Sequence, residues 1–232
     1  YIDVRTSIGI ENKIFPFVSI GTEPQDYGFK GALSYIKIGD RNIIREGVTI
    51  NPGTKPETET KVGSECYLMV NSHIAHNCKV GNKVILVNSA LLAGYVEVGD
   101  GAILSGHTAV HQFCRIGRFA MLGGGSAISM DLPPFMMTIG KISVEGVNRI
   151  GLRRNNFSRE KINAISDLYK IFFREGLNTT NSIEKIRKDI PPLPEIEEFI
   201  GFVLSSKRGV LRRVRSVQKP TEEQYRAQAL ER

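Results

Sequence analysis

Histidine is the residue type in this chain best suited to acid–base chemistry, and three of the four histidines fall at related positions of a repeat. His73 and His76 flank Ile74, and His111 directly follows Val110, two turns of the repeat further along. A neutral imidazole can take a proton from an attacking hydroxyl, whereas three converging imidazoles can bind zinc. Both chemistries require the fold to bring these residues together.

The repeat that places the histidines has a period of six residues. The apolar positions carry only Ile, Leu or Val, at Val62, Leu68, Ile74, Val80, Leu86, Leu92, Val98, Leu104, Val110, Ile116, Leu122 and Ile128. Neither a helix, with period 3.6, nor an isolated strand, with period 2, selects every sixth residue. Glycine follows the apolar residue once every third hexad, at Gly63, Gly81, Gly99 and Gly117. The sequence therefore predicts an all-β parallel β-helix, a three-faced prism whose coils stack about 4.8 Å apart.

The positions two residues before each apolar residue are small or β-branched, as the inside of a narrow prism requires. All three cysteines, Cys66, Cys78 and Cys114, fall at these positions. Their number is odd and their spacing shows no pairing, which argues against a disulfide framework. We interpret the cysteines as core residues rather than metal ligands or redox groups.

Two insertions interrupt the hexads, one between Ile20 and Ile38 and one between Ile50 and Val62. Both leave after the third hexad of a coil, at the corner that also carries His73, His76 and His111. Loops that project from one edge of a solenoid commonly carry binding groups. His107 falls at another corner and is interpreted as structural or solvated.

The hexads fail at Asp131-Leu132-Pro133-Pro134, and helical patterns follow. Ser158 is a predicted N-cap for an amphipathic helix ending before Gly176, and shorter helices are expected near Ser182–Ile190 and Glu195–Leu204. We predict a parallel β-helix domain over 1–133, a linker and helical C-terminal domain over 134–210, and a charged, flexible tail over 211–232.

The composition narrows the function classes. The net charge of +7 lacks the aromatic-interleaved basic run of a nucleic-acid-binding protein, so no nucleic acid is expected, and the charge suits a phosphate-bearing substrate or an acidic protein partner. The sequence contains no apolar run of membrane-spanning length and no leader, so we expect a cytoplasmic protein without stable membrane insertion. The chain begins with Tyr1 rather than Met, which suggests a fragment.

Zinc is the weaker of the two histidine chemistries. Carbonic anhydrases built on this kind of β-helix use a His-x4-His pair, whereas His107 and His111 are separated by three residues. We therefore expect no metal and favour general base catalysis.

Several segments resemble the acyl-carrier-protein-dependent UDP-N-acetylglucosamine O-acyltransferases of lipid A biosynthesis, a family of hexapeptide-repeat acyltransferases. They are Pro24-Gln25-Asp26, Ile38-Gly39-Asp40-Arg41-Asn42, Asn71-Ser72-His73-Ile74-Ala75-His76, Leu92-Ala93-Gly94, Thr108-Ala109-Val110-His111-Gln112-Phe113 and Phe157-Ser158-Arg159-Glu160. The resemblance runs from about Tyr1 to Val210 and starts inside a typical member, so the first coils are expected to be missing. It implies a left-handed β-helix and a homotrimer with active sites between subunits.

The resemblance also implies residue roles. His76 matches the general base for the sugar 3-hydroxyl, and the Gly94 N–H matches the oxyanion donor. Groups that match glucosamine or acyl contacts are His73, His111, Gln112 and Asp26; those that match nucleotide contacts are Asn148 and Arg154. Gly124 lies where a side chain would cap the acyl groove, so a longer hydroxyacyl chain is expected.

Some positions depart from the family pattern. Asn77 replaces the aspartate that normally orients the base, and an amide accepts a hydrogen bond but supplies no charge. Tyr95 stands where a histidine is usual. Gly28 replaces a lysine that reaches the substrate in the family, and Lys30 is close enough in sequence to take over that contact.

The resulting hypothesis is transfer of a 3-hydroxyacyl chain from acyl carrier protein to the 3-OH of UDP-N-acetylglucosamine, the first step of lipid A biosynthesis. No cofactor is expected, because the acyl-phosphopantetheine arrives on the carrier protein. The alternatives are a related transferase with another acyl donor or an amino-sugar acceptor, and a non-catalytic paralogue that binds nucleotide sugar.

Overall fold

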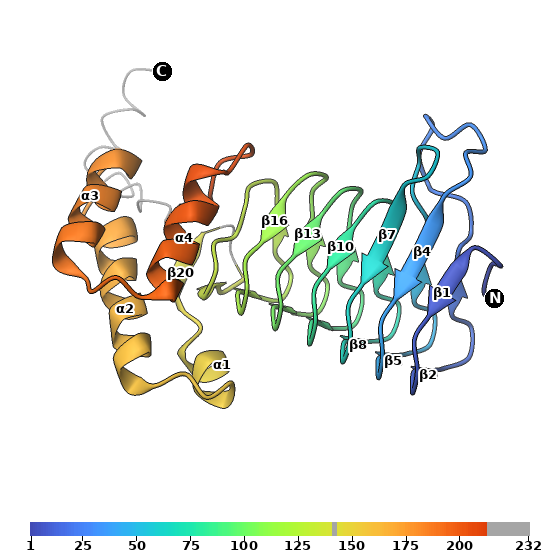
Figure 1. Cartoon of the computed structure of the whole chain (residues 1–232), viewed down its shortest axis with the longest axis horizontal. Helices are drawn as coiled ribbons and strands as arrows, with labels where there is room; N and C mark the ends of the chain where they lie inside the picture. The colour runs from blue at the N-terminus through green and yellow to red at the C-terminus, as the bar shows by residue number, and fades with distance from the viewer. Residues whose placement is uncertain (141–142, 213–232) are drawn as a thin grey trace, which may run out of the picture.

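The computed structural model describes residues 1–140 and 143–212, and the chain folds as a left-handed parallel β-helix followed by helices. Figure 1 shows the coils stacked along the long axis, with the N-terminus at one end and the helices at the other. No helix among the described residues is long and apolar enough to cross a membrane.

Within the described residues, the strands form three sheets, one for each face of the prism. The first face contains β1 (Thr6–Ile8), β4 (Tyr35–Ile38), β7 (Glu59–Val62), β10 (Lys79–Val80), β13 (Glu97–Val98) and β16 (Arg115–Ile116). The second contains β2 (Lys13–Ile14), β5 (Ile43–Ile44), β8 (Tyr67–Leu68), β11 (Ile85–Leu86), β14 (Ile103–Leu104), β17 (Met121–Leu122), β19 (Met136–Thr138) and β20 (Val144–Val147). The third contains β3 (Ser19–Ile20), β6 (Thr49–Ile50), β9 (His73–Ile74), β12 (Leu91–Leu92), β15 (Ala109–Val110) and β18 (Ala127–Ile128).

The predicted register is confirmed. Residues eighteen apart pair in parallel, as in Leu86 with Leu104 and Leu92 with Val110. The apolar positions point into the prism and are buried, and the cysteines lie among them. Burial raises the pKa of the Cys66 thiol to about 11 and that of Cys78 to about 12, which agrees with their interpretation as core residues.

The recurring glycines are required by the contact between coils. A side chain at Gly63 would place its Cβ 2.6 Å from the carbonyl oxygen of Gly81, and one at Gly99 would meet the Arg118 nitrogen at 2.6 Å. Neither glycine has a positive φ, so the constraint is space rather than backbone conformation.

The chain turns at each corner through a left-handed residue three positions after the apolar one. These residues are not glycine at most corners and include Glu65, Asn71, Asn77, Lys83, Ser89, Tyr95, His107, Phe113 and Phe119. Asparagine and histidine tolerate this conformation better than most residues. Asn77 and Tyr95 are therefore fixed in place by the coil geometry itself.

The helical domain follows the predicted order with two additions. The hairpin of β19 and β20 and the short helix α1 (Arg149–Arg154) precede α2 (Arg159–Arg174), α3 (Thr179–Asp189) and α4 (Pro194–Leu204). The predicted N-cap is confirmed, since the Ser158 side chain accepts a hydrogen bond from the Lys161 N–H. Because β19 pairs in parallel with β17, the coil pattern extends beyond the boundary predicted at residue 133.

The predicted tail, 211–232, begins too early. Leu211 is buried and its N–H donates to the Asp131 carbonyl, and the Arg212 guanidinium donates to the Phe172 carbonyl and to Thr179. These two residues belong to the folded domain. The remainder of the predicted tail, 213–232, lies outside the described residues.

Candidate active site

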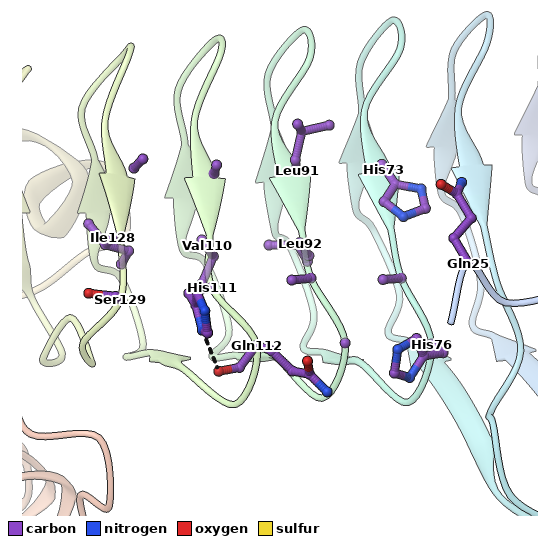
Figure 2. A pocket seen from close by; sticks show the side chains of 15 residues that line it. Gln25, His73, His76, Leu91, Leu92, Val110, His111, Gln112, Ile128 and Ser129 are labelled. Carbon is purple, nitrogen blue, oxygen red and sulfur yellow. Dashed lines mark hydrogen bonds between the residues drawn. The ribbon is translucent and has the colours of Figure 1, made fainter. Parts of the chain in front are cut away.

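The three histidines predicted to cluster do lie along one edge of the third sheet. β9 pairs with β12 and β12 with β15, so His73 and the residue preceding His111 are separated by a single strand. Figure 2 shows His73, His76 and His111 along the same edge of the coils. His107 lies at another corner and is exposed, as predicted.

His76 is buried, and its two ring nitrogens face different side chains. Its Nδ1 lies 3.1 Å from the Asn77 side-chain oxygen, and its Nε2 lies 3.5 Å from a carboxylate oxygen of Asp26. Asp26 comes from the first insertion, where its other oxygen accepts the Gly28 N–H at 2.7 Å. The insertion thus carries an acidic group to the ring nitrogen that faces the open groove.

Gly94 lies directly against the His76 ring. A Cβ at this position would be 2.5 Å from His76 Nε2 and 3.0 Å from Nδ1, so only glycine fits. The backbone N–H groups on either side of Gly94 are hydrogen-bonded. The Ala93 N–H donates to the Val110 carbonyl, and the Tyr95 N–H donates to the His76 carbonyl. Within residues 1–140 and 143–212, the Gly94 N–H has no backbone acceptor, which leaves it available to a bound oxyanion.

His73 is half-buried on β9, and its Nδ1 lies 2.7 Å from the Thr49 hydroxyl. Burial, and to a lesser extent the neighbouring His76, lowers the pKa of His73 below its ordinary value. The ring is therefore neutral at pH 7 and can exchange hydrogen bonds with a sugar.

His111 is contacted by the C-terminal domain. Its Nδ1 lies 3.2 Å from an Arg208 guanidinium nitrogen and 3.2 Å from the Gln112 carbonyl oxygen. Arginine can only donate and a carbonyl oxygen can only accept, so Nδ1 makes the first contact when the ring proton is on Nε2 and the second when it is on Nδ1. The two contacts are therefore alternatives for the same ring nitrogen.

An apolar groove of about 590 Å³ runs along this edge. Its apolar lining residues are Ala75, Leu91, Leu92, Ala93, Ala109, Val110, Ala127 and Ile128, and its polar ones are Gln25, His73, His76, His111, Gln112 and Ser129. Figure 2 shows Leu91 and Leu92 on one coil and Val110 and Ile128 on the next two, with His111 beside Val110. The combination suits a long apolar chain whose reactive end lies at His76.

The other predicted site residues lie away from this groove. Lys30 is exposed on the first insertion, and Gly124 is exposed at the corner before β18, where a Cβ would find its nearest neighbour at 3.5 Å. Asn148 caps α1 and donates to the Phe119 carbonyl, and Arg154 is exposed on α1. Within one chain these residues do not meet His76, so their predicted roles stay predictions.

Sequence reasoning missed three residues that the structure places at the site. Gln25 lines the groove, Arg208 contacts His111, and Thr54 contacts Asn77 and Tyr95. Gln25 lies in the first insertion and Thr54 in the second, and the sequence does predict that both insertions emerge at the corner with the histidines. No sequence pattern predicts that Arg208 reaches the site, because its position depends on how the helices dock.

A buried histidine beside an apolar groove on a left-handed parallel β-helix is typical of acyltransferases of the hexapeptide-repeat class. The family model for UDP N-acetylglucosamine O-acyltransferase, Domain 2, matches residues 131–211. The chain is 45% identical to the acyl-[acyl-carrier-protein]–UDP-N-acetylglucosamine O-acyltransferase of Syntrophobacter fumaroxidans, across 91% of this chain and 83% of the relative. It is 57% identical to the enzyme of the same name from Chlorobium phaeobacteroides, across 82% of this chain and 73% of the relative.

Solved structures agree. The crystal structure of LpxA, a UDP-N-acetylglucosamine acyltransferase from Bacteroides fragilis, superposes with a TM-score of 0.89 at 43% identity, covering 91% of this chain and 83% of that one. The chain belongs to the acyl-[acyl-carrier-protein]–UDP-N-acetylglucosamine O-acyltransferase family.

Proposed function

We propose that this protein transfers a 3-hydroxyacyl chain from acyl carrier protein to the 3-OH of UDP-N-acetylglucosamine, as the first step of lipid A biosynthesis. The names of the relatives support the carrier protein and the nucleotide sugar as substrates. The observation that carries the proposal is that the His76 ring lies against Gly94 at an apolar groove, and that the Gly94 N–H has no backbone acceptor in the part of the chain that the structure describes.

The reaction needs one base and one oxyanion donor. His76 Nε2 takes the proton of the sugar hydroxyl as its oxygen bonds to the thioester carbonyl carbon. The carbonyl oxygen becomes an oxyanion and accepts the Gly94 N–H. When the intermediate collapses, the C–S bond breaks and the imidazolium returns the proton to the phosphopantetheine thiolate. The ester and the free thiol are the products, and no cofactor is consumed.

Polar groups around His76 suit the glucosamine. Asp26 lies on the open side of the ring, and His73, His111 and Gln112 line the same groove. The apolar wall beyond them takes the acyl chain. Gly124 lies away from this groove within one chain, so a role in setting acyl length requires a neighbouring subunit; the absence of a side chain there favours a longer chain.

The nucleotide contacts assigned to Asn148 and Arg154 require a second copy of the chain, because neither residue reaches His76 within one chain. We infer a homotrimer with the active site between neighbouring subunits, and a cytoplasmic setting in which the carrier protein is available. Sedimentation velocity tests the assembly: a trimer is expected, and a stable, active monomer would contradict it.

Product analysis by mass spectrometry tests the reaction. The protein is incubated with UDP-N-acetylglucosamine and a ladder of 3-hydroxyacyl carrier proteins, with parallel reactions using acyl-coenzyme A and a 3-amino sugar nucleotide. The expected product is the 3-O-acylated nucleotide sugar, formed fastest from a long hydroxyacyl carrier protein. Product only from coenzyme A or the amino sugar would indicate the related-transferase alternative. Nucleotide-sugar binding without turnover would indicate a non-catalytic paralogue.

A further inference from the structure

The amide of Asn77 is held by more groups than the catalytic histidine alone. Its side-chain oxygen lies 3.1 Å from His76 Nδ1, 3.0 Å from the Thr54 backbone nitrogen and 3.1 Å from the Thr54 hydroxyl. A backbone N–H can only donate, so the atom facing Thr54 must be the oxygen of the amide and not its nitrogen. His76 Nδ1 then carries the proton, and Nε2 keeps the lone pair that a base needs. The Asp26 carboxylate lies 3.5 Å from Nε2, outside the usual hydrogen-bond range, whereas Asn77 lies 3.1 Å from Nδ1.

The Thr54 hydroxyl is itself part of a chain of hydrogen bonds. It lies 3.2 Å from the Tyr95 hydroxyl. Because Thr54 donates its proton to the Asn77 oxygen, the Tyr95 hydroxyl is the donor in this second contact. The Tyr95 ring lies edge-on to His76, with centroids 5.3 Å apart, and stacks on Phe113 at 5.0 Å. The Tyr95 hydroxyl thus donates to Thr54, and the Thr54 hydroxyl donates to the Asn77 oxygen. The same oxygen also accepts the hydrogen bond from His76 Nδ1.

An amide at position 77 makes this arrangement necessary. The two oxygens of an aspartate are equivalent, so either orientation of a carboxylate accepts the Nδ1 proton. An asparagine turned by half a rotation would present its NH2 group to Nδ1. The imidazole would then place its proton on Nε2 and could not act as a base.

We propose that Thr54, supported by the Tyr95 hydroxyl, is a positioning residue that fixes the Asn77 amide and through it the catalytic tautomer of His76. This inference rests on the proposed function, since it gives Nε2 the role of the base. Thr54 lies in the second insertion, at the corner where both insertions leave the coil. The insertion therefore supplies an orienting group as well as a wall of the site.

Two readouts test the inference, and the first needs no activity. Ring-nitrogen NMR of His76 is recorded for the native protein, Thr54→Val, Thr54→Ser and Tyr95→Phe. The native ring is expected with its proton on Nδ1, and Thr54→Val with a measurable fraction on Nε2. Thr54→Ser keeps the hydroxyl and should restore the native pattern. An unchanged tautomer in Thr54→Val overturns the proposal even if the native protein turns over no substrate.

The second readout is a double-mutant comparison with steady-state kinetics. Loss of one neutral hydrogen bond predicts that Thr54→Val lowers kcat roughly fivefold, with the KM for the sugar nucleotide unchanged. In an Asn77→Asp background, where orientation no longer matters, the same substitution should change kcat by less than about twofold. Equal losses in both backgrounds would mean that the hydroxyl only supports the loop, which contradicts the proposal.

Thr58→Val is the matched control. Thr58 lies in the same insertion and its hydroxyl donates to the Lys55 carbonyl at 2.7 Å, without a contact to Asn77. Its removal should leave kcat and the His76 tautomer at native values. A loss in Thr58→Val as large as that in Thr54→Val would assign the effect to the loop as a whole and overturn the specific role of Thr54.

Discussion

At the scale of single residues, the proposed base His76 contacts the amide of Asn77, at the position where the family resemblance leads us to expect a carboxylate. Asn77 lies at a left-handed corner with φ of 60°, and its N–H donates to the Thr60 hydroxyl at 2.8 Å. The corner geometry and this hydrogen bond together fix Asn77, the residue that faces His76 Nδ1. The amide orients the imidazole but does not neutralise the imidazolium that forms during the reaction.

A charge at this position should therefore accelerate the reaction. Asn77→Asp keeps the size of the side chain and places a carboxylate among the same donors, from Thr54 and His76. We expect kcat to rise by about tenfold, because the carboxylate stabilises the imidazolium. Steady-state rates with saturating substrates measure this, and a lower kcat in a folded variant would contradict it.

His73 links the site to the pH dependence of stability. Burial lowers its pKa in the folded state below the ordinary value of 6.5, so the unfolded chain binds the proton more readily. The free energy of unfolding should fall as the pH drops through 6.5 and level off below the folded pKa. Urea titrations of the native protein and His73→Gln across about pH 5 to 8 measure the difference. Equal slopes for both proteins would contradict this expectation.

The residues of the site differ in how far the sequence predicts them. His73, His76, Gly94 and His111 are predictable because the hexads give their corner and the motifs give their types. Thr54 is not, since its role depends on the path of an irregular insertion that the hexads do not describe.

At the scale of elements, the hexads predict the strands from β1 to β18 because a buried apolar residue every sixth position permits only one register. The hairpin of β19 and β20 and the helix α1 are missed. α1 spans Arg149–Arg154, too short to show a helical period, and the hairpin contains no hexad.

Coil stacking gives a test at this scale. Gly99→Ala should destabilise the fold by about 1–3 kcal/mol, because its Cβ would meet the Arg118 backbone nitrogen at 2.6 Å. Gly201→Ala in α4 is the matched control, since a Cβ there has no neighbour within 4 Å and alanine favours a helix. Urea denaturation measures both. Equal stability of the two variants would show that the coils can separate without cost.

At the scale of the whole molecule, the helical domain docks on the last coil through charged contacts. Buried Asp131 accepts hydrogen bonds from the Arg115 backbone and guanidinium and from the Ser206 hydroxyl. Arg118 pairs with Glu198 of α4 at 2.7 Å. The same docking carries Arg208 to His111, so the helical domain contacts one residue of the groove.

Removing the central acceptor should loosen this docking. Asp131→Ala leaves the Arg115 guanidinium without its buried partner, which predicts a loss of about 3 kcal/mol in the free energy of unfolding. Because Ser206 also loses its acceptor, Arg208 should release His111. Urea denaturation measures the loss, and a change below about 1 kcal/mol would show that the domain is held by its apolar contacts instead.

The central claim is that His76 is the general base of acyl transfer, and its removal is the most direct measurement. His76→Ala should lower kcat by about 10²- to 10⁴-fold in the carrier-protein assay, while UDP-N-acetylglucosamine still binds and the protein still folds. Turnover in His76→Ala within about tenfold of the native rate would contradict the account and assign proton removal to another group.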